Sequence, residues 1–165
     1  MSSRCFVALG ANLGDPIVTV SKAIEALRDL PDTEFTAASS LYRTAPVGLK
    51  HQPDFINAVV ELVAVPPAQT LLEMLFAIEA RFGRRRSIRN APRTLDLDLL
   101  LYGDETSDDP HLSLPHPRLH ERAFVLAPLA ELAPRLVIPG RGPVTDLLLQ
   151  CRDQLIEKLV PQTAA

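Results

Sequence analysis

The sequence predicts an α+β domain in which helices pack on a mostly antiparallel sheet. Short apolar runs, several of them rich in β-branched residues, alternate with segments whose apolar residues recur at helical spacing. Prolines and glycines stand at the ends of most of these segments. The chain has the length of one domain, so residues 1–165 are expected to form a single domain.

The first strand and the first helix are expected near the N-terminus. Residues 5–9 (CFVAL) form a short apolar run that predicts a buried strand. After a turn, Asp15 is a good helix N-cap and Pro16 is a good first helical residue. Apolar residues at helical spacing then extend this helix to about Leu30.

Two strands, a second helix and a further strand follow. Residues 35–43 and the β-branched run 55–65 predict strands, and the loop 44–53 between them contains two prolines and a glycine. Apolar residues at helical spacing predict a helix over 71–82. Residues 95–102 then predict a strand, after an irregular arginine-rich segment.

This order is the split βαββαβ arrangement of ferredoxin-like folds. The remaining residues predict a C-terminal extension to that core. We expect a polar loop over 103–114, a helix over 121–132, a short strand over 136–138 and a helix over 144–159.

Composition and charge narrow the classes of function. With 47% hydrophobic and 22% charged residues, the chain is globular. Because the net charge is −3, an arginine cluster in this chain indicates a local anion site and not a general nucleic-acid coat. Two isolated cysteines predict free thiols. There is neither an apolar run of ~18 residues nor a signal-peptide start, which predicts a cytoplasmic protein.

The most informative segment is 81–101 (RFGRRRSIRNAPRTLDLDLLL). Six arginines fall within thirteen residues, and Asp96 and Asp98 follow them, each flanked by leucines. Because side chains alternate between the two faces of a strand, both aspartates should lie on one face. The leucines between and beside them should lie on the other face, in the core.

Two carboxylates beside a row of guanidinium groups predict a site for a divalent metal and a polyphosphate. Carboxylates bind Mg²⁺, and arginines bind phosphate oxygens in a bidentate manner. The sequence has neither a GxxxxGK[ST] loop nor a GxGxxG motif after its first strand. An arginine run can also be a solvated face, but two like charges on one strand face repel unless a cation lies between them. We therefore interpret the segment as a site of nucleotide-dependent phosphoryl transfer.

Several segments together resemble the 6-hydroxymethyl-7,8-dihydropterin pyrophosphokinase family of folate biosynthesis. They lie in the family's order and cover most of the chain. The matching segments are ALGANLGD (8–15), SSLYRTAPVG (39–48), QPDFINAVVEL (52–62), PRTLDLDLL (92–100) and LPHPRLHERAFVLAPLAELAP (114–134). The resemblance implies a ferredoxin-like fold. It also implies an enzyme in which ATP donates its β,γ-pyrophosphoryl group to the pterin hydroxymethyl oxygen, leaving AMP.

The resemblance also implies roles for the charged residues. Asp96 and Asp98 would bind two Mg²⁺ ions that bridge the triphosphate. Arg84 and Arg93 would be the main catalytic arginines and would stabilise charge on the transferring phosphoryl groups. Four further residues would contact ATP or its phosphates, the first two by closing over the nucleotide: Arg86, Arg89, His116 and Arg122.

The pterin pocket is expected to combine stacking with hydrogen bonds at the ring edge, because a pterin is flat and polar. Phe55 and Phe124 match the family's two stacking aromatics. Asn57 offers both a donor and an acceptor and lies two residues from Phe55, on the same strand face. Three residues match positions whose backbone lines the pterin: Thr44, Ala45 and Val47. Three positions depart from the family's usual residues and bear on loop closure and nucleotide affinity: Ala45, Asn90 and Ala91.

Other classes of function were weighed against this one. Many ferredoxin-like domains bind RNA by stacking bases on aromatics, but this chain has only six Phe, two Tyr and no Trp. A non-catalytic pterin-binding relative would lack metal ligands, and none is lost here. Another phosphoryl transferase would use the same site on a different acceptor, and only the aromatic pocket argues against it. We expect a monomer whose partners are ATP and the pterin, without nucleic acid or membrane.

Overall fold

The computed structural model describes residues 2–45, 53–83 and 95–159. Its main feature is a six-stranded sheet with the strand order β10-β3-β4-β1-β5, in which β2 also pairs with β4. All strand pairs of this sheet within the described residues are antiparallel. The strands are β1 (Ser3–Ala11), β2 (Thr33–Ala38), β3 (Tyr42–Thr44), β4 (Phe55–Ala64), β5 (Asp96–Tyr102) and β10 (Ile156–Lys158). The predicted α+β class and ferredoxin-like order are confirmed.

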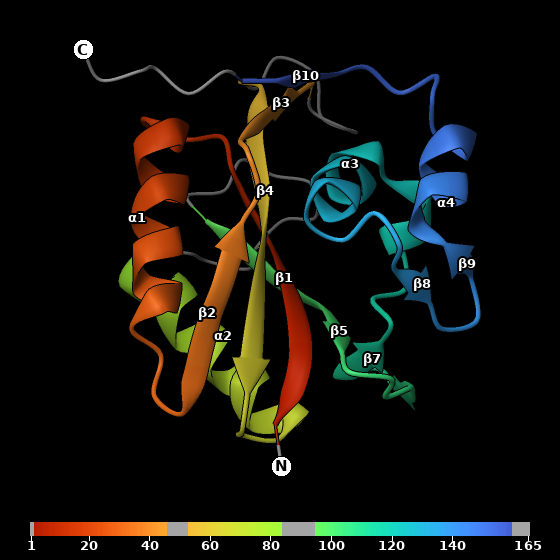
Figure 1. Ribbon diagram of the computed structural model, residues 1–165. Helices are drawn as coiled ribbons and strands as arrows, with labels where there is room; N and C mark the ends of the chain where they lie inside the picture. The colour runs from red at the N-terminus through yellow and green to blue at the C-terminus, as the bar shows by residue number, and fades with distance from the viewer. Residues whose placement is uncertain (1, 46–52, 84–94, 160–165) are drawn as a thin grey trace.

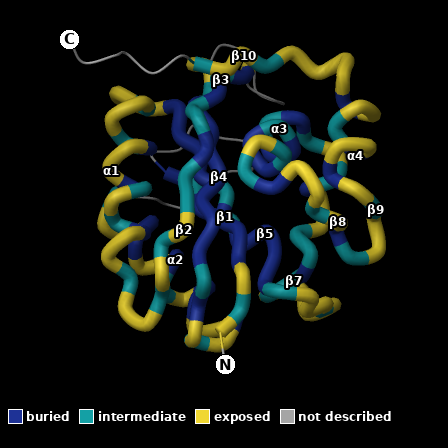
Figure 2. Tube along the Cα trace, in the orientation of Figure 1, coloured by how far each residue is buried: buried dark blue, intermediate teal, exposed yellow. Residues whose placement is uncertain are grey.

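Helices cover both faces of the sheet (Figure 1). Helices α1 (Pro16–Arg28) and α2 (Ala68–Arg81) bury one apolar cluster against the first face. Helices α3 (Ala123–Leu132) and α4 (Val144–Gln150) bury a second cluster against the other face. Strands β1 and β4 are therefore buried over most of their length (Figure 2). Within the described ranges, none of the helices has the length and apolarity needed to cross a membrane.

The N-terminal elements follow the sequence signals. Asp15 caps α1, because its side-chain Oδ1 accepts a hydrogen bond from the backbone N–H of Val18 at 3.3 Å. Pro16 is the first helical residue, as predicted. The buried residues of α1 are Val20, Ala23 and Leu27, spaced three and four apart.

The predicted strand 35–43 is wrong in one respect, because the chain leaves the strand conformation between β2 and β3. At this break Ser39 Oγ accepts a hydrogen bond from Val59 N, and Ser39 N donates to Val59 O, both at 2.9 Å. A side-chain hydroxyl thus replaces a backbone acceptor. Strands β2 and β3 still pair with β4 on either side of the break.

The extension differs from the prediction in two places. The expected polar loop 103–114 contains a hairpin of β6 (Ser107–Asp109) and β7 (Leu112–Leu114). The expected helix 144–159 ends at Gln150, and β10 then pairs with β3. Gln154 holds the intervening turn, because its side chain accepts from Ala123 N and donates to Glu121 O. The extension also contains a 3₁₀ turn (Leu119–Glu121) and a short hairpin of β8 (Val137–Ile138) and β9 (Gly142–Pro143).

Glu131 of α3 connects the extension to the break between β2 and β3. Its carboxylate accepts hydrogen bonds from Tyr42 Oη at 2.7 Å, Ser40 N at 2.9 Å and Ser40 Oγ at 3.0 Å. The Nζ atom of Lys158 lies 3.8 Å away. Burial raises the pKa of Glu131, but the hydrogen bonds from Tyr42 and Ser40 and the charge of Lys158 together hold it below its ordinary value of 4.5.

We expect Glu131→Gln to lower the free energy of unfolding by about 1–2 kcal/mol at pH 7, because it weakens charge-assisted hydrogen bonds to a partly exposed group. A carboxyl whose pKa is lowered in the folded state stabilises above its unfolded pKa and loses that contribution as the pH falls. The difference between wild type and variant should therefore shrink below pH 4.5. Denaturant unfolding from pH 7 to pH 3 measures it.

The matched control is Glu157→Gln. Glu157 is an exposed residue of β10, and its Oε1 lies 3.9 Å from Arg43 Nη1. This change should alter stability by less than about 0.5 kcal/mol. An equal effect of Glu131→Gln at both pH extremes would contradict the assignment.

Candidate functional site

Asp96 and Asp98 lie on the same face of β5. The alternating leucines Leu95, Leu97 and Leu99 are buried in the cluster beneath α1 and α2. The two aspartates are half-buried and face the side of the sheet that α3 covers. The predicted alternation of carboxylate and leucine is therefore confirmed.

A small recess on this second face brings predicted residues of two kinds together. Asp96 and Asp98 line it together with Asn57 of β4 and Phe124 of α3. The two predicted metal ligands thus lie beside two predicted pterin ligands. Residues 8–10 of β1 form the floor between them.

The register of three strands sets this arrangement. Gly10 pairs with Asn57 of β4 on one side and with Asp96 of β5 on the other. Asn57, Gly10 and Asp96 therefore form one row across the sheet. A Cβ atom at Gly10 would lie only 3.1 Å from Asn57 Oδ1, so the missing side chain leaves room for the amide of Asn57.

The side chain of Asn57 is oriented by Thr44 of β3. Asn57 Nδ2 donates to Thr44 Oγ1 at 2.9 Å, and both residues are buried. This bond uses the amide nitrogen and directs Oδ1 toward Gly10. Ala45 follows Thr44 and is exposed, and Phe55 is half-buried at the start of β4. Val47 lies outside the described residues.

His116, between β7 and the 3₁₀ turn, lies beside Asp98. Its Nε2 is 4.0 Å from Asp98 Oδ1, its Nδ1 accepts from Arg118 N at 3.3 Å, and its backbone N–H donates to Leu100 O at 2.9 Å. Burial lowers the pKa of His116 to about 4, with a further lowering by Arg122, while Asp96 acts in the opposite direction. The imidazole is therefore neutral at neutral pH. Because Nδ1 accepts, the proton is assigned to Nε2, on the side of Asp98.

A second cavity of about 220 Å³ adjoins the carboxylates along the outer edge of β5. Leu72 and Phe76 of α2 form one wall, and Ser113 of β7 lies on another side. Asp98 lines this cavity as well as the smaller recess, and His116 lines it too. The two hollows therefore meet at Asp98, so ligands in the two hollows could approach the same carboxylate.

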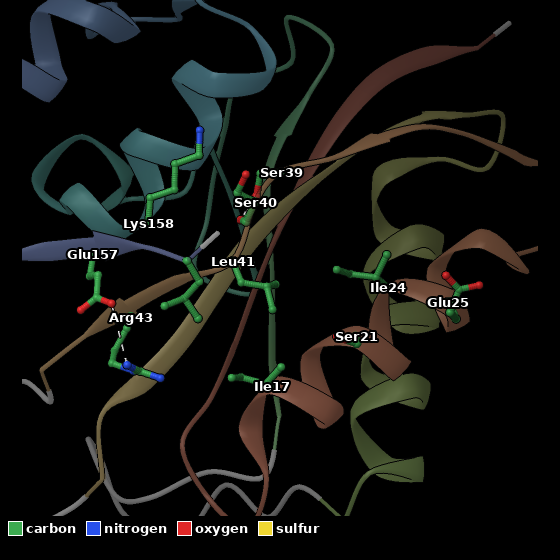
Figure 3. Close-up of a pocket in the computed structure, with 11 residues that line it drawn as sticks. Ile17, Ser21, Ile24, Glu25, Ser39, Ser40, Leu41, Arg43, Glu157 and Lys158 are labelled. Carbon is green, nitrogen blue, oxygen red and sulfur yellow. Dashed lines mark hydrogen bonds and ion pairs between the residues drawn. The ribbon is translucent and has the colours of Figure 1, made fainter. Parts of the chain in front are cut away.

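A wider cavity of about 780 Å³ lies elsewhere (Figure 3). Side chains of α1, among them Ile17 and Ile24, face Leu41 across it, and Arg43 and Glu157 lie at its rim. None of the predicted site residues that the structure describes lines this cavity. It lies at the β3–β10 edge of the sheet, opposite to β5, so size alone does not identify the site.

The structure describes the chain on both sides of the arginine segment, up to residue 83 and again from residue 95. Arg84, Arg86, Arg89 and Arg93 all lie outside the described residues. Arg122 is described and stands just before α3, with its guanidinium carbon 5.6 Å from the centre of the Phe124 ring. Segment 84–94 joins the end of α2 to the start of β5, and Arg93 precedes Asp96 by only three residues.

Magnesium fits the donors that are present. Within the described ranges, no group of three or more His, Cys, Asp or Glu side chains could hold a metal. Mg²⁺ commonly takes only one or two carboxylates and completes its shell with water and substrate phosphates. Asp96 and Asp98 both line the recess, and Asp98 also lines the cavity, so the pair matches that requirement.

Sequence reasoning missed Gly10 and Glu79. Glu79 of α2 is only 3% exposed, and its Oε2 accepts a hydrogen bond from Leu97 N at 2.8 Å. A signal for it was present, because Glu79 occupies the fourth position after Leu75, on the apolar stripe of its helix.

Comparisons with known proteins agree on one family. A sequence model of 7,8-dihydro-6-hydroxymethylpterin-pyrophosphokinase (HPPK) matches residues 6–134. A Pseudomonas aeruginosa protein is 44% identical over 96% of this chain and 98% of its own length. A Haemophilus influenzae protein is 40% identical over 94% and 98%. Both are named 2-amino-4-hydroxy-6-hydroxymethyldihydropteridine pyrophosphokinase.

Solved structures show the same fold at much lower sequence identity. Two crystal structures of Plasmodium falciparum HPPK-DHPS, one of a variant and one of the wild type, superpose with TM-scores of 0.71 and 0.69. Their identities to this chain are 12% and 14%, and each match covers 91% of it. The chain spans less than half of those longer chains, 45% and 41%.

In the protein without ligands, we expect His116 to titrate near pH 4 because of its burial and the nearby charge of Arg122. Nitrogen-detected NMR at pH 6.5 should show a neutral ring with its proton on Nε2. Arg122→Met should raise the pKa of His116, whereas the control Arg141→Met, at an exposed arginine of the β8–β9 turn, should leave it unchanged. A wild-type midpoint at or above 6.5 would contradict this account.

Proposed function

The chain belongs to the 7,8-dihydro-6-hydroxymethylpterin-pyrophosphokinase family, and we propose that the row Asn57–Gly10–Asp96 is the centre of its active site. The enzyme is a pyrophosphokinase of folate biosynthesis that transfers pyrophosphate from ATP to the hydroxymethyl group of 6-hydroxymethyl-7,8-dihydropterin. The observation that carries the site assignment is this row, which places an amide suited to the pterin edge beside a carboxylate suited to a metal.

Asp96 and Asp98 would hold two Mg²⁺ ions between the two hollows. When bound, the ions would neutralise the triphosphate and lower the pKa of the pterin hydroxymethyl group. The protein's own contribution is to keep both carboxylates on one strand face, with Asp98 at the point where the two hollows meet. None of the described side chains stands out as a general base, and the reaction requires chiefly positioning and charge neutralisation.

ATP would occupy the cavity beside α2. Leu72 and Phe76 offer an apolar wall for the base, while Asp98 and His116 lie at the phosphate side. His116, being neutral, would donate one hydrogen bond from Nε2 to a phosphate oxygen. Positive charge would come from Arg122 and from four arginines of segment 84–94. Arg84 and Arg93 would lie at the transferring phosphoryl groups. Arg86 and Arg89 would close over the nucleotide.

The pterin would lie in the smaller recess, with its hydroxymethyl group toward Asp96 and Asp98. Thr44 accepts from one of the two N–H groups of the Asn57 amide, and Asn57 Oδ1 would accept a hydrogen bond from the pterin edge. Phe124 and Phe55 would stack on the ring. The backbone of three residues would line the ring edge: Thr44, Ala45 and Val47.

We also propose that residues 1–165 act as one domain and as a monomer in the cytoplasm, with ATP and the pterin as partners and without nucleic acid or membrane. The support for a single domain is the packing of both apolar clusters on the two faces of one sheet. The support for small-molecule partners is the family to which the chain belongs.

The test of the function is product analysis with ATP, Mg²⁺ and 6-hydroxymethyl-7,8-dihydropterin. AMP should form one-for-one with the pterin diphosphate. Asp96→Ala should reduce turnover by about 10³-fold or more while pterin binding survives, because it removes a metal ligand. The matched control is Asp108→Ala, an exposed carboxylate of β6, which should keep full activity. ADP with a pterin monophosphate would reject pyrophosphoryl transfer, and full activity of Asp96→Ala would reject the site.

Gly10→Ala should weaken pterin binding about tenfold, because the new Cβ would press on Asn57 Oδ1 and disturb one hydrogen bond. Calorimetric titration of Gly10→Ala, Asn57→Ala and the double variant measures this effect. If both changes act through the same amide, their effects should not add. Additive losses would show that Gly10 acts independently of Asn57.

A further inference from the structure

Glu79 is a buried carboxylate that contacts the strand segment between the two aspartates. It lies near the end of α2 and is 3% exposed. Its Oε2 accepts a hydrogen bond from the backbone N–H of Leu97 at 2.8 Å, a contact across eighteen residues of sequence. Leu97 lies between Asp96 and Asp98. A fully buried glutamate is rare unless it is engaged in such contacts, which indicates a specific role.

The contact lies where β5 has least support. Among the strands that the structure describes, β5 is the last of the sheet and pairs there with β1 alone. An irregularity between Phe6 and Val7 separates the two halves of this pairing, so the half with the aspartates pairs with residues 7–10 of β1 alone. In this half of the strand, Glu79 supplies an acceptor for the N–H of Leu97. Without an acceptor, this buried N–H would be costly.

We propose that Glu79 is a positioning residue of the metal site. By holding the N–H of Leu97, its carboxylate fixes the backbone from which Asp96 and Asp98 project, and thereby their spacing. Metal affinity depends on such outer contacts, because ligands must be held in the productive geometry before the ion binds. This inference rests on the proposed function, since it assumes that the two aspartates bind the metal.

The competing explanation is that Glu79 only stabilises the fold. Two variants separate the explanations. Glu79→Ala removes the acceptor of Leu97 N and leaves a hole beneath β5. Leu75→Ala, one helical turn earlier on α2, also makes a hole in the same apolar cluster but leaves the Leu97 hydrogen bond in place. A purely structural role predicts equal effects of the two holes on metal affinity once their stabilities are matched.

The experiment measures Mn²⁺ binding to the full chain with a non-transferable ATP analogue, by the electron paramagnetic resonance signal of free Mn²⁺. Glu79→Ala should weaken Mn²⁺ binding about 10–100-fold. It should also speed exchange of the Leu97 amide in NMR, while pterin affinity without nucleotide stays unchanged. Glu79→Gln keeps an acceptor oxygen and should retain most of the affinity. Glu79→Asp, whose side chain is one methylene shorter, should also bind Mn²⁺ more weakly. If Glu79→Ala does not fold, Glu79→Asp takes its place in the comparison.

Three results would overturn the proposal. The first is wild-type Mn²⁺ affinity in Glu79→Ala or Glu79→Asp, and the second is an equal loss in Leu75→Ala. The third is a loss in Glu79→Gln as large as in Glu79→Ala, which would assign the effect to charge. Asp96→Ala distinguishes a failure of the underlying function: if it binds Mn²⁺ as tightly as wild type, the metal lies elsewhere and the site assignment fails as well.

Discussion

The antiparallel pairing of β1 with β4 on one side and β5 on the other is the constraint on which the site depends. It places residues from positions 10, 57 and 96 in one row, although they are far apart in the sequence. A shift of this register by one residue would turn the side chains of β5 to the opposite face. Asp96 and Asp98 would then point into the apolar core, and the leucines would face the recess. The core packing that fixes the register therefore also fixes the site.

The C-terminal extension completes the site by covering the second face of the sheet. Helix α3 brings Phe124 over the recess, and its far end is held to the sheet by Glu131. Strand β10 then pairs with β3, which carries Thr44. The hydrogen bond from Asn57 to Thr44 thus lies within a stretch of sheet that the extension supports from two directions. In this fold the extension therefore supports the residues that line the recess.

Local patterns in the sequence were sufficient to predict the elements that depend on local physics. The N-cap at Asp15 and the carboxylate–leucine alternation of β5 are examples, and together with the resemblance they placed Asp96, Asp98, Asn57 and Phe124 in one site. At the break between β2 and β3, by contrast, Ser40 donates to Glu131, which lies ninety-one residues later in the chain. The end of α4 depends on the contacts of Gln154. The place of Glu79 on the apolar stripe of α2 was visible in the sequence, but its partner, the backbone N–H of Leu97, was not.

The two faces of β5 contribute to stability with opposite signs: the aspartates repel each other on one face, and the leucines are buried on the other. Comparing the two magnitudes explains how the strand can form without a bound cation. Two carboxylates two residues apart on a strand are separated by roughly 7 Å, so their repulsion is about 0.6 kcal/mol in water and about 2.4 kcal/mol at an effective dielectric constant of 20. Burial of each of the three leucines contributes roughly 1.5–3 kcal/mol as an upper estimate. The apolar face therefore outweighs the repulsion on the polar face. The like charges can be held close together in the folded chain, where a divalent cation bound as proposed would relieve their repulsion.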